Sequence, residues 1–85
     1  MSESHEIRLK RLQMRSMRRG IKEMDILLSA FAAENLGQMD AARLDLYEAL
    51  LHENDQDLYQ WVTGQVPAND TFRDLIADIA QTYQK

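Results

Sequence analysis

The chain has 85 residues, no cysteine and a formal net charge of −4, and 45% of its residues are hydrophobic. This length predicts one domain, residues 1–85, with a modest core. The composition excludes disulfides and thiolate chemistry, and no apolar run approaches the roughly 18 residues of a membrane span. Because the first residues lack an apolar signal core, we do not expect secretion.

Opposite charges occupy different parts of the chain. Residues 1–22 carry a balance of +5, and residues 23–85 carry −9. The seven basic side chains of the first part are Arg8, Lys10, Arg11, Arg15, Arg18, Arg19 and Lys22. A nucleic-acid-binding domain is usually basic overall, and the acidic residues 23–85 would repel a phosphate backbone. This distribution therefore favours a protein partner.

Every strong periodic pattern in the chain is helical. We expect residues 1–5 to be disordered and five helices to follow, over residues 6–18, 21–34, 41–52, 56–63 and 72–83. Ser4 and Asp40 are the expected N-caps of the first and third helices. No strand pattern competes, so the predicted fold class is all-α, a compact single-domain bundle of five short helices.

A charged corner, residues 18–23, joins the first two predicted helices. Gly20 can end the first helix in the left-handed conformation, or it can be the N-cap of the second. In the second case Glu23 is the third helical residue, where a carboxylate meets the positive end of the helix dipole. Neither role explains why Arg18 and Arg19 crowd positive charge here. From these residues alone the corner is either turn chemistry or a docking point for another protein.

The side chains that could support catalysis do not form a recognisable set, so we predict no enzyme and no catalytic residue. Acidic residues near His52 suggest a metal site. A calcium loop counted from Asp55 would need glycine and glutamate where Gln60 and Val66 stand. We therefore expect a solvated helix-capping cluster and no metal. The chain also lacks a glycine-rich phosphate loop, so it has no recognisable nucleotide cradle.

Two blocks of sequence resemble a known family. The run from Arg18 to Asp25 resembles the R-G-x-x-E signature of the succinate dehydrogenase flavinylation factors, the SdhE-like assembly factors. The leucine-rich segment 44–51 and the D-x-D-L-x-x-W segment 55–61 are similar to a second block of that family. The resemblance extends over about residues 6–83.

The resemblance implies an assembly factor that binds the flavoprotein subunit of succinate dehydrogenase, or of fumarate reductase. It would promote covalent attachment of FAD to a histidine of this client, and the FAD would belong to the client. Whether FAD touches this chain is left open. Carried over by position, the partner-binding residues are Arg18, Arg19, Gly20, Glu23, Asp25, Asp55, Asp57 and Trp61. The plainer alternative for the second block is a capped helix start with a core tryptophan.

A second hypothesis assigns the basic first helix to nucleic acid or to an anionic membrane. No aromatic residue accompanies its basic side chains, as stacking on single strands would require, and the acidic body opposes it. We therefore expect a monomer that binds a protein, with neither nucleic acid nor a membrane span. Because no transit peptide is evident, bacterial cytoplasm is the expected location. A processed protein of the mitochondrial matrix would look similar.

Overall fold

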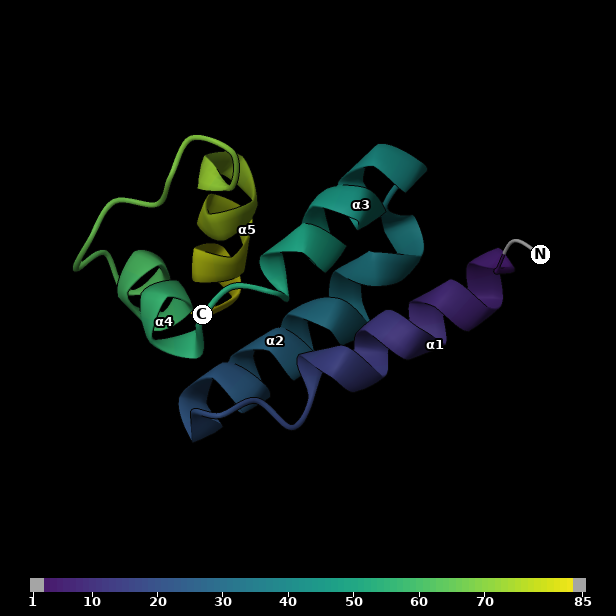
Figure 1. The fold of residues 1–85 in the computed structure, drawn as a ribbon, viewed down its shortest axis with the longest axis horizontal. Coiled ribbons are helices and arrows are strands. Elements are labelled where there is room, and N and C mark those ends of the chain that lie inside the picture. Colours follow the sequence, from purple (N-terminus) through teal and green to yellow (C-terminus); the bar gives the residue numbers. More distant parts are fainter. Residues whose placement is uncertain (1–2, 84–85) are drawn as a thin grey trace.

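The computed structural model describes residues 3–83 and is all-α over that range, which confirms the predicted fold class. The body measures about 40 × 25 × 23 Å (Figure 1). The elements are α1 (His5–Ser16), α2 (Lys22–Asn35), the short 3-10 helix η1 (Leu36–Gln38), α3 (Ala41–Leu50), α4 (Asp55–Val62) and α5 (Arg73–Tyr83).

The predicted helix boundaries agree with these bounds within one or two residues. Both expected N-caps are confirmed: the side chain of Ser4 accepts from the Ile7 amide at 3.2 Å, and that of Asp40 accepts from the Arg43 amide at 2.8 Å. The segment between the second and third predicted helices contains the short helix η1. Of the residues expected to be disordered, 1 and 2 lie outside the described residues.

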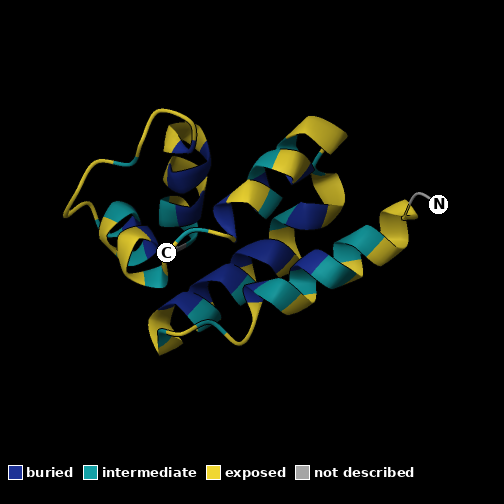
Figure 2. Cartoon of the chain, in the orientation of Figure 1, coloured by how far each residue is buried: buried dark blue, intermediate teal, exposed yellow. Residues whose placement is uncertain are grey.

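Helix α2 supplies much of the core because it contacts α1, α4 and α5 (Figure 2). Its buried face includes Met24, Leu28 and Phe31, and the ring of Phe31 stacks on that of Tyr47 from α3 at a centroid distance of 5.8 Å. Burying one such side chain stabilises the fold by about 1.5–3 kcal/mol. The periodic apolar stripe of α2 thus places the corner at its N-terminus against the rest of the bundle.

One buried polar contact joins α1 to α3. The Ser16 hydroxyl donates to the Leu12 carbonyl at 2.8 Å, and it lies 2.5 Å from the Tyr47 hydroxyl. Since the only hydroxyl hydrogen of Ser16 points at Leu12, Tyr47 is the donor in the second bond. Burial raises the pKa of Tyr47 to about 12, so the phenol stays neutral and able to donate.

Candidate functional site

The corner between α1 and α2 has a backbone that differs from both predictions for Gly20. Arg18, with φ of 60°, is the residue in the left-handed conformation, and Ile21 is the N-cap of α2. Both roles predicted for Gly20 were therefore wrong. Glu23 is the second residue of α2 and not the third, because the helix begins at Lys22.

Gly20 allows the carboxylate of Asp55 to lie close to the backbone of the corner. Its amide donates to Oδ2 of Asp55 at 2.5 Å, and a Cβ built on Gly20 would lie 3.2 Å from that same oxygen. Any side chain here would push the carboxylate away by a few tenths of an ångström. Gly20 is therefore explained by its contact with the start of α4 and not by its dihedral angles.

Arg19 binds the other oxygen of the same carboxylate. Its Nε donates to Oδ1 of Asp55 at 2.7 Å, and its terminal nitrogens donate to the carbonyls of Leu51 at 2.9 Å and Glu53 at 3.2 Å. The Arg19 side chain is only 11% exposed and that of Asp55 15%. Charge-assisted bonds of this kind, aimed partly at the carbonyl end of α3, tie the α1–α2 corner to the α3–α4 corner.

The remaining predicted residues lie around this contact in different environments. Arg18, Glu23 and Asp57 are exposed. Asp25 is half-buried and accepts a hydrogen bond from the Ser29 hydroxyl at 3.4 Å. Of the eight predicted residues, the structure therefore brings Arg19, Gly20 and Asp55 into direct contact, from both blocks of the sequence.

Trp61 is half-buried and packs toward α5. Its ring lies 6.2 Å from that of Phe72 at a tilt of 30°, and it lines a cavity of about 450 Å³ under the α4–α5 connection with Pro67 and Arg73. This position fits part of the core-tryptophan alternative, because Trp61 packs against the core and is only partly buried.

Sequence reasoning missed a groove beside the corner. It is lined by Glu23, Ile26, Leu27, Ala30 and Thr82. Ile26 is 63% exposed and lies outside the periodic stripe of α2, and that departure from the pattern was the available signal.

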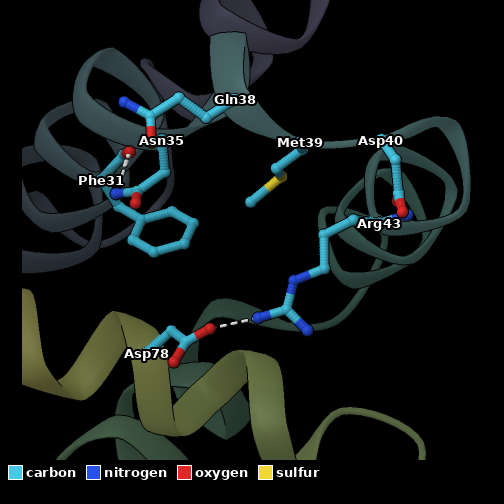
Figure 3. Close-up of a pocket in the computed structure, with 7 residues that line it drawn as sticks. All are labelled: Phe31, Asn35, Gln38, Met39, Asp40, Arg43 and Asp78. Atoms are coloured by element: carbon cyan, nitrogen blue, oxygen red, sulfur yellow. Dashed lines mark hydrogen bonds and ion pairs between the residues drawn. The ribbon is translucent and has the colours of Figure 1, made fainter.

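A polar hollow of about 330 Å³ between α3 and α5 contains none of the predicted residues (Figure 3). Arg43 of α3 forms an ion pair with Asp78 of α5 across it, and the Asn35 amide group donates to the Phe31 carbonyl at 2.9 Å. The Arg43–Asp78 pair holds α3 against α5, and the Asn35 bond lies within α2, so these polar groups already have partners within the fold.

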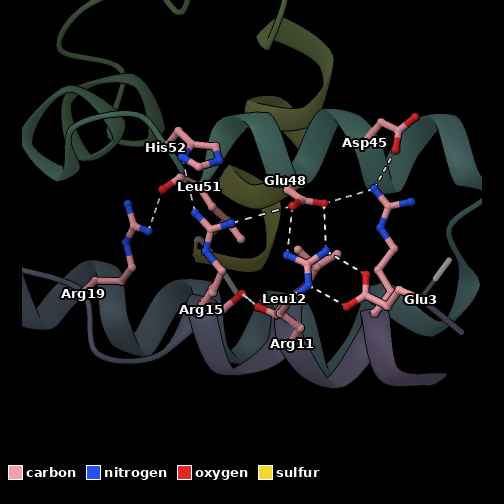
Figure 4. Close-up of polar contacts among 11 residues, drawn as sticks. Glu3, Arg11, Leu12, Arg15, Arg19, Asp45, Glu48, Leu51 and His52 are labelled. Carbon is pink, nitrogen blue, oxygen red and sulfur yellow. Dashed lines mark hydrogen bonds and ion pairs between the residues drawn. The ribbon is translucent and has the colours of Figure 1, made fainter. Parts of the chain in front are cut away.

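The basic edge of the chain is largely neutralised from within. Arg11 and Arg15 reach from α1 to Glu48 of α3 (Figure 4), and Arg8 pairs with acidic side chains of the same helix. Arg8 lies 2.6 Å from Asp45, and Arg11 lies 2.8 Å from Glu48. The hydrogen bond from Arg11 is the main cause that holds the pKa of Glu48 below its usual value.

With Arg19 included, four of the seven basic side chains of residues 1–22 have internal acidic partners. Lys10, Arg18 and Lys22 are exposed and form no ion pair within residues 3–83. Of these seven cations only three thus remain for an external partner, which weakens the nucleic-acid and membrane hypothesis.

Among the described residues, the histidine and acidic side chains form no group of three or more that could hold a metal ion. Asp55 is instead bound to Arg19 and Gly20, and the exposed ring of His52 lies 3.5 Å from the Arg15 guanidinium. Over residues 3–83, each helix is too short or too polar to cross a membrane.

The fold and the corner define a small all-helical protein in which one charged contact joins the α1–α2 corner to the α3–α4 corner. Residues 10–83 match a protein-family model described as flavinator of succinate dehydrogenase. With 74 of 85 residues matched, the chain belongs to this family of assembly factors.

Three relatives, each named succinate dehydrogenase assembly factor 2, mitochondrial, agree with the family model. The protein of Candida glabrata is 50% identical over 62 residues, 73% of this chain and 40% of the relative. Those of Meyerozyma guilliermondii and Danio rerio are 38% and 35% identical, each over 98% of this chain and over 62% and 54% of the relative. The chain thus spans between two fifths and about three fifths of the length of these curated relatives.

Proposed function

We propose that this chain binds the flavoprotein subunit of succinate dehydrogenase, or the related subunit of fumarate reductase, and promotes covalent attachment of FAD to it. The observation that carries the proposal is the shared carboxylate of Asp55, which binds Arg19 and Gly20 of the R-G-x-x-E run. Two blocks that are distant in sequence thereby form one connected surface. Membership of the flavinator family supports the same function.

Within this proposal the residues of the corner divide into two roles. Arg19 and Asp55 position the corner, because their charged groups are already bound to each other. Arg18 and Glu23 are exposed and would form ion pairs with side chains of the client. Gly20 would contribute exposed backbone to this surface while it keeps the Asp55 carboxylate close to the corner.

The second block would extend the same surface along α4. Asp57 is exposed, and Trp61 lies one turn further on the same helix face, so both could contact one partner. Asp25, in the first turn of α2, would support this surface through its bond with Ser29.

The proposed mechanism is binding and not catalysis by this chain. A helper of this kind favours one client conformer by differential affinity, here the conformer in which the acceptor histidine and FAD are correctly placed. The FAD is cargo of the client, and this chain contributes the docking surface that holds that conformer. We place the protein where its client matures, in bacterial cytoplasm or in the mitochondrial matrix.

Co-expression with the client subunit tests the function directly. Covalently bound flavin is measured by in-gel fluorescence of the denatured subunit, with and without this chain. We expect stronger fluorescence in its presence, together with a complex that co-purifies. Equal fluorescence in both samples, with no complex, would remove the proposal.

A further inference from the structure

A groove of about 260 Å³ is lined by residues of α2 and by Thr82 near the C-terminal end of α5, a helix that contacts α2. Three of its lining residues, Ile26, Leu27 and Ala30, are apolar, and Thr82 closes it from α5. Glu23, a residue of the R-G-x-x-E run, lies at its rim. The groove and the charged corner therefore share a residue.

Ile26 presents apolar surface to solvent. Its exposed fraction of 63% is the highest of any large hydrophobic residue described, and removing this surface from water against a partner would be favourable. A single exposed isoleucine is ordinary on a surface. Here it borders a groove that the small side chain of Ala30, one turn along α2, leaves open.

Glu23 adds a negative charge at the rim of the groove. Its carboxylate is exposed and forms neither an ion pair nor a hydrogen bond with the side chains of residues 3–82. An unpaired carboxylate beside an apolar groove is complementary to a lysine or arginine next to an apolar side chain. The chemistry of the fitting ligand is thus a short segment that carries both.

We propose that this groove is the apolar half of the client-binding surface. It receives one aliphatic or aromatic side chain of the flavoprotein subunit, and a neighbouring lysine or arginine of that subunit pairs with Glu23. The assignment rests on the proposed function, because the corner that carries Glu23 is the surface assigned to the client. A groove of about 260 Å³ has room for one or two side chains, whereas a stable dimer buries a far wider interface of roughly 1,200–2,000 Å². It therefore suits an anchor within a larger interface better than a contact between two copies.

The test compares two isoleucines of nearly equal exposure. Ile26→Ser removes the proposed anchor, and Ile7→Ser, at the far end of α1 from the corner and 59% exposed, makes the same chemical change elsewhere. The affinity of each purified variant for the apo flavoprotein subunit is measured by titration calorimetry. We expect roughly tenfold weaker binding for Ile26→Ser, as for the loss of an interface anchor, and no change for Ile7→Ser.

A second pair of variants fills the groove instead of emptying it. Ala30→Phe places a ring in the groove, whereas Ala33→Phe places it on an exposed position of α2 that does not line the groove. Thermal melts establish that each variant is folded. Weaker client binding by Ala30→Phe alone supports the proposal.

Three outcomes separate the possible failures. If the wild-type protein does not bind the subunit, the proposed function itself fails. If it binds, and both Ile26→Ser and Ala30→Phe bind equally well, the groove assignment is overturned and the function stands. If Ile26→Ser abolishes self-association in light scattering but leaves client affinity unchanged, the groove belongs to a second copy, and the assignment is again overturned.

Discussion

The amide of Gly20 donates to Asp55 across 35 residues of sequence at 2.5 Å, and the second oxygen of that carboxylate binds Arg19. One carboxylate thereby satisfies a backbone donor and a guanidinium that lie side by side. The contact explains why an arginine and a glycine are adjacent in the R-G-x-x-E run. The carboxylate comes from the first residue of α4, so the contact joins the two blocks of sequence.

Loss of this carboxylate should destabilise the fold. Asp55→Ala leaves the poorly exposed guanidinium of Arg19 with only its two carbonyl acceptors, and it leaves the Gly20 amide without its acceptor. We expect a loss of about 2 kcal/mol in the free energy of unfolding, a decrease in Tm on the order of 10 °C for a domain of this size. Urea denaturation measures the change.

Asp57→Ala is the matched control for this prediction. Asp57 lies in the same first turn of α4 and is exposed, so its removal should cost at most about 0.5 kcal/mol through the helix dipole. Equal losses in the two variants would show that Asp55 acts only as a charge at a helix start.

Arg18 allows stability and binding to be separated, because its φ of 60° is strained for a residue with a side chain. Arg18→Gly relieves this strain and removes the exposed guanidinium. We expect unchanged or slightly higher stability, by up to about 1 kcal/mol, together with several-fold weaker client binding. A variant that lost stability and kept its affinity would contradict the role assigned to Arg18.

The ion pairs that Arg8, Arg11 and Arg15 of α1 form with Asp45 and Glu48 of α3 predict a dependence of stability on pH. The pKa of Glu48 is lowered from 4.5, chiefly by the hydrogen bond from Arg11, so folding favours the charged carboxylate. Its contribution is complete above pH 4.5 and is lost as the pH falls through the lower pKa of the folded state.

Glu48→Gln should therefore be less stable than the wild type at pH 7, by about 1 kcal/mol or less because the pairs are partly exposed. The difference should shrink toward pH 3, and it should also shrink in about 1 M salt. Urea unfolding at both pH values gives the comparison. A difference that is constant with pH and salt would indicate a packing effect.

The buried hydroxyl pair predicts a second, alkaline effect. Tyr47→Phe removes the donor to Ser16, which keeps its bond to Leu12, so we expect a loss of only about 1 kcal/mol. Burial raises the pKa of Tyr47 from 10 to about 12, so folding favours the neutral phenol. This contribution is present below pH 10 and is lost as the pH rises toward 12. Chemical unfolding between pH 9 and 12 should show the wild type losing more stability than Tyr47→Phe.

The helices could be predicted from the sequence because they depend on local patterns. Ser4 and Asp40 are short polar residues that cap the N-termini of α1 and α3, as their positions in the sequence predict. The apolar stripe that contains Met24, Leu28 and Phe31 faces the core. The pairing of Arg19 with Asp55 could not be predicted in the same way. The pairing depends on how the two corners meet after the helices have packed. Local patterns in either block of sequence do not specify that arrangement.

Gly20 shows a related limit. A glycine between two helices is usually explained by its freedom to adopt a positive φ. That explanation pointed to Gly20, whereas the residue with positive φ is Arg18. The actual requirement is the close approach to Asp55, which is a tertiary property. Ile26, in contrast, departs visibly from the apolar stripe of α2, so its exposure could have been predicted.

The central claim, that the corner binds the client flavoprotein, is tested most directly by a large side chain at Gly20. Gly37→Arg is the matched control, because a Cβ at that exposed glycine would meet no atom within 4 Å. For both variants, calorimetry measures affinity for the apo flavoprotein subunit, and a thermal melt measures stability.

We predict at least tenfold weaker binding for Gly20→Arg, with a Tm only a few degrees lower because the Asp55 carboxylate has to shift by a few tenths of an ångström. Gly37→Arg should bind and melt like the wild type. If Gly20→Arg binds like the wild type, or loses affinity only in proportion to its unfolded fraction, the corner is a turn and the account is contradicted.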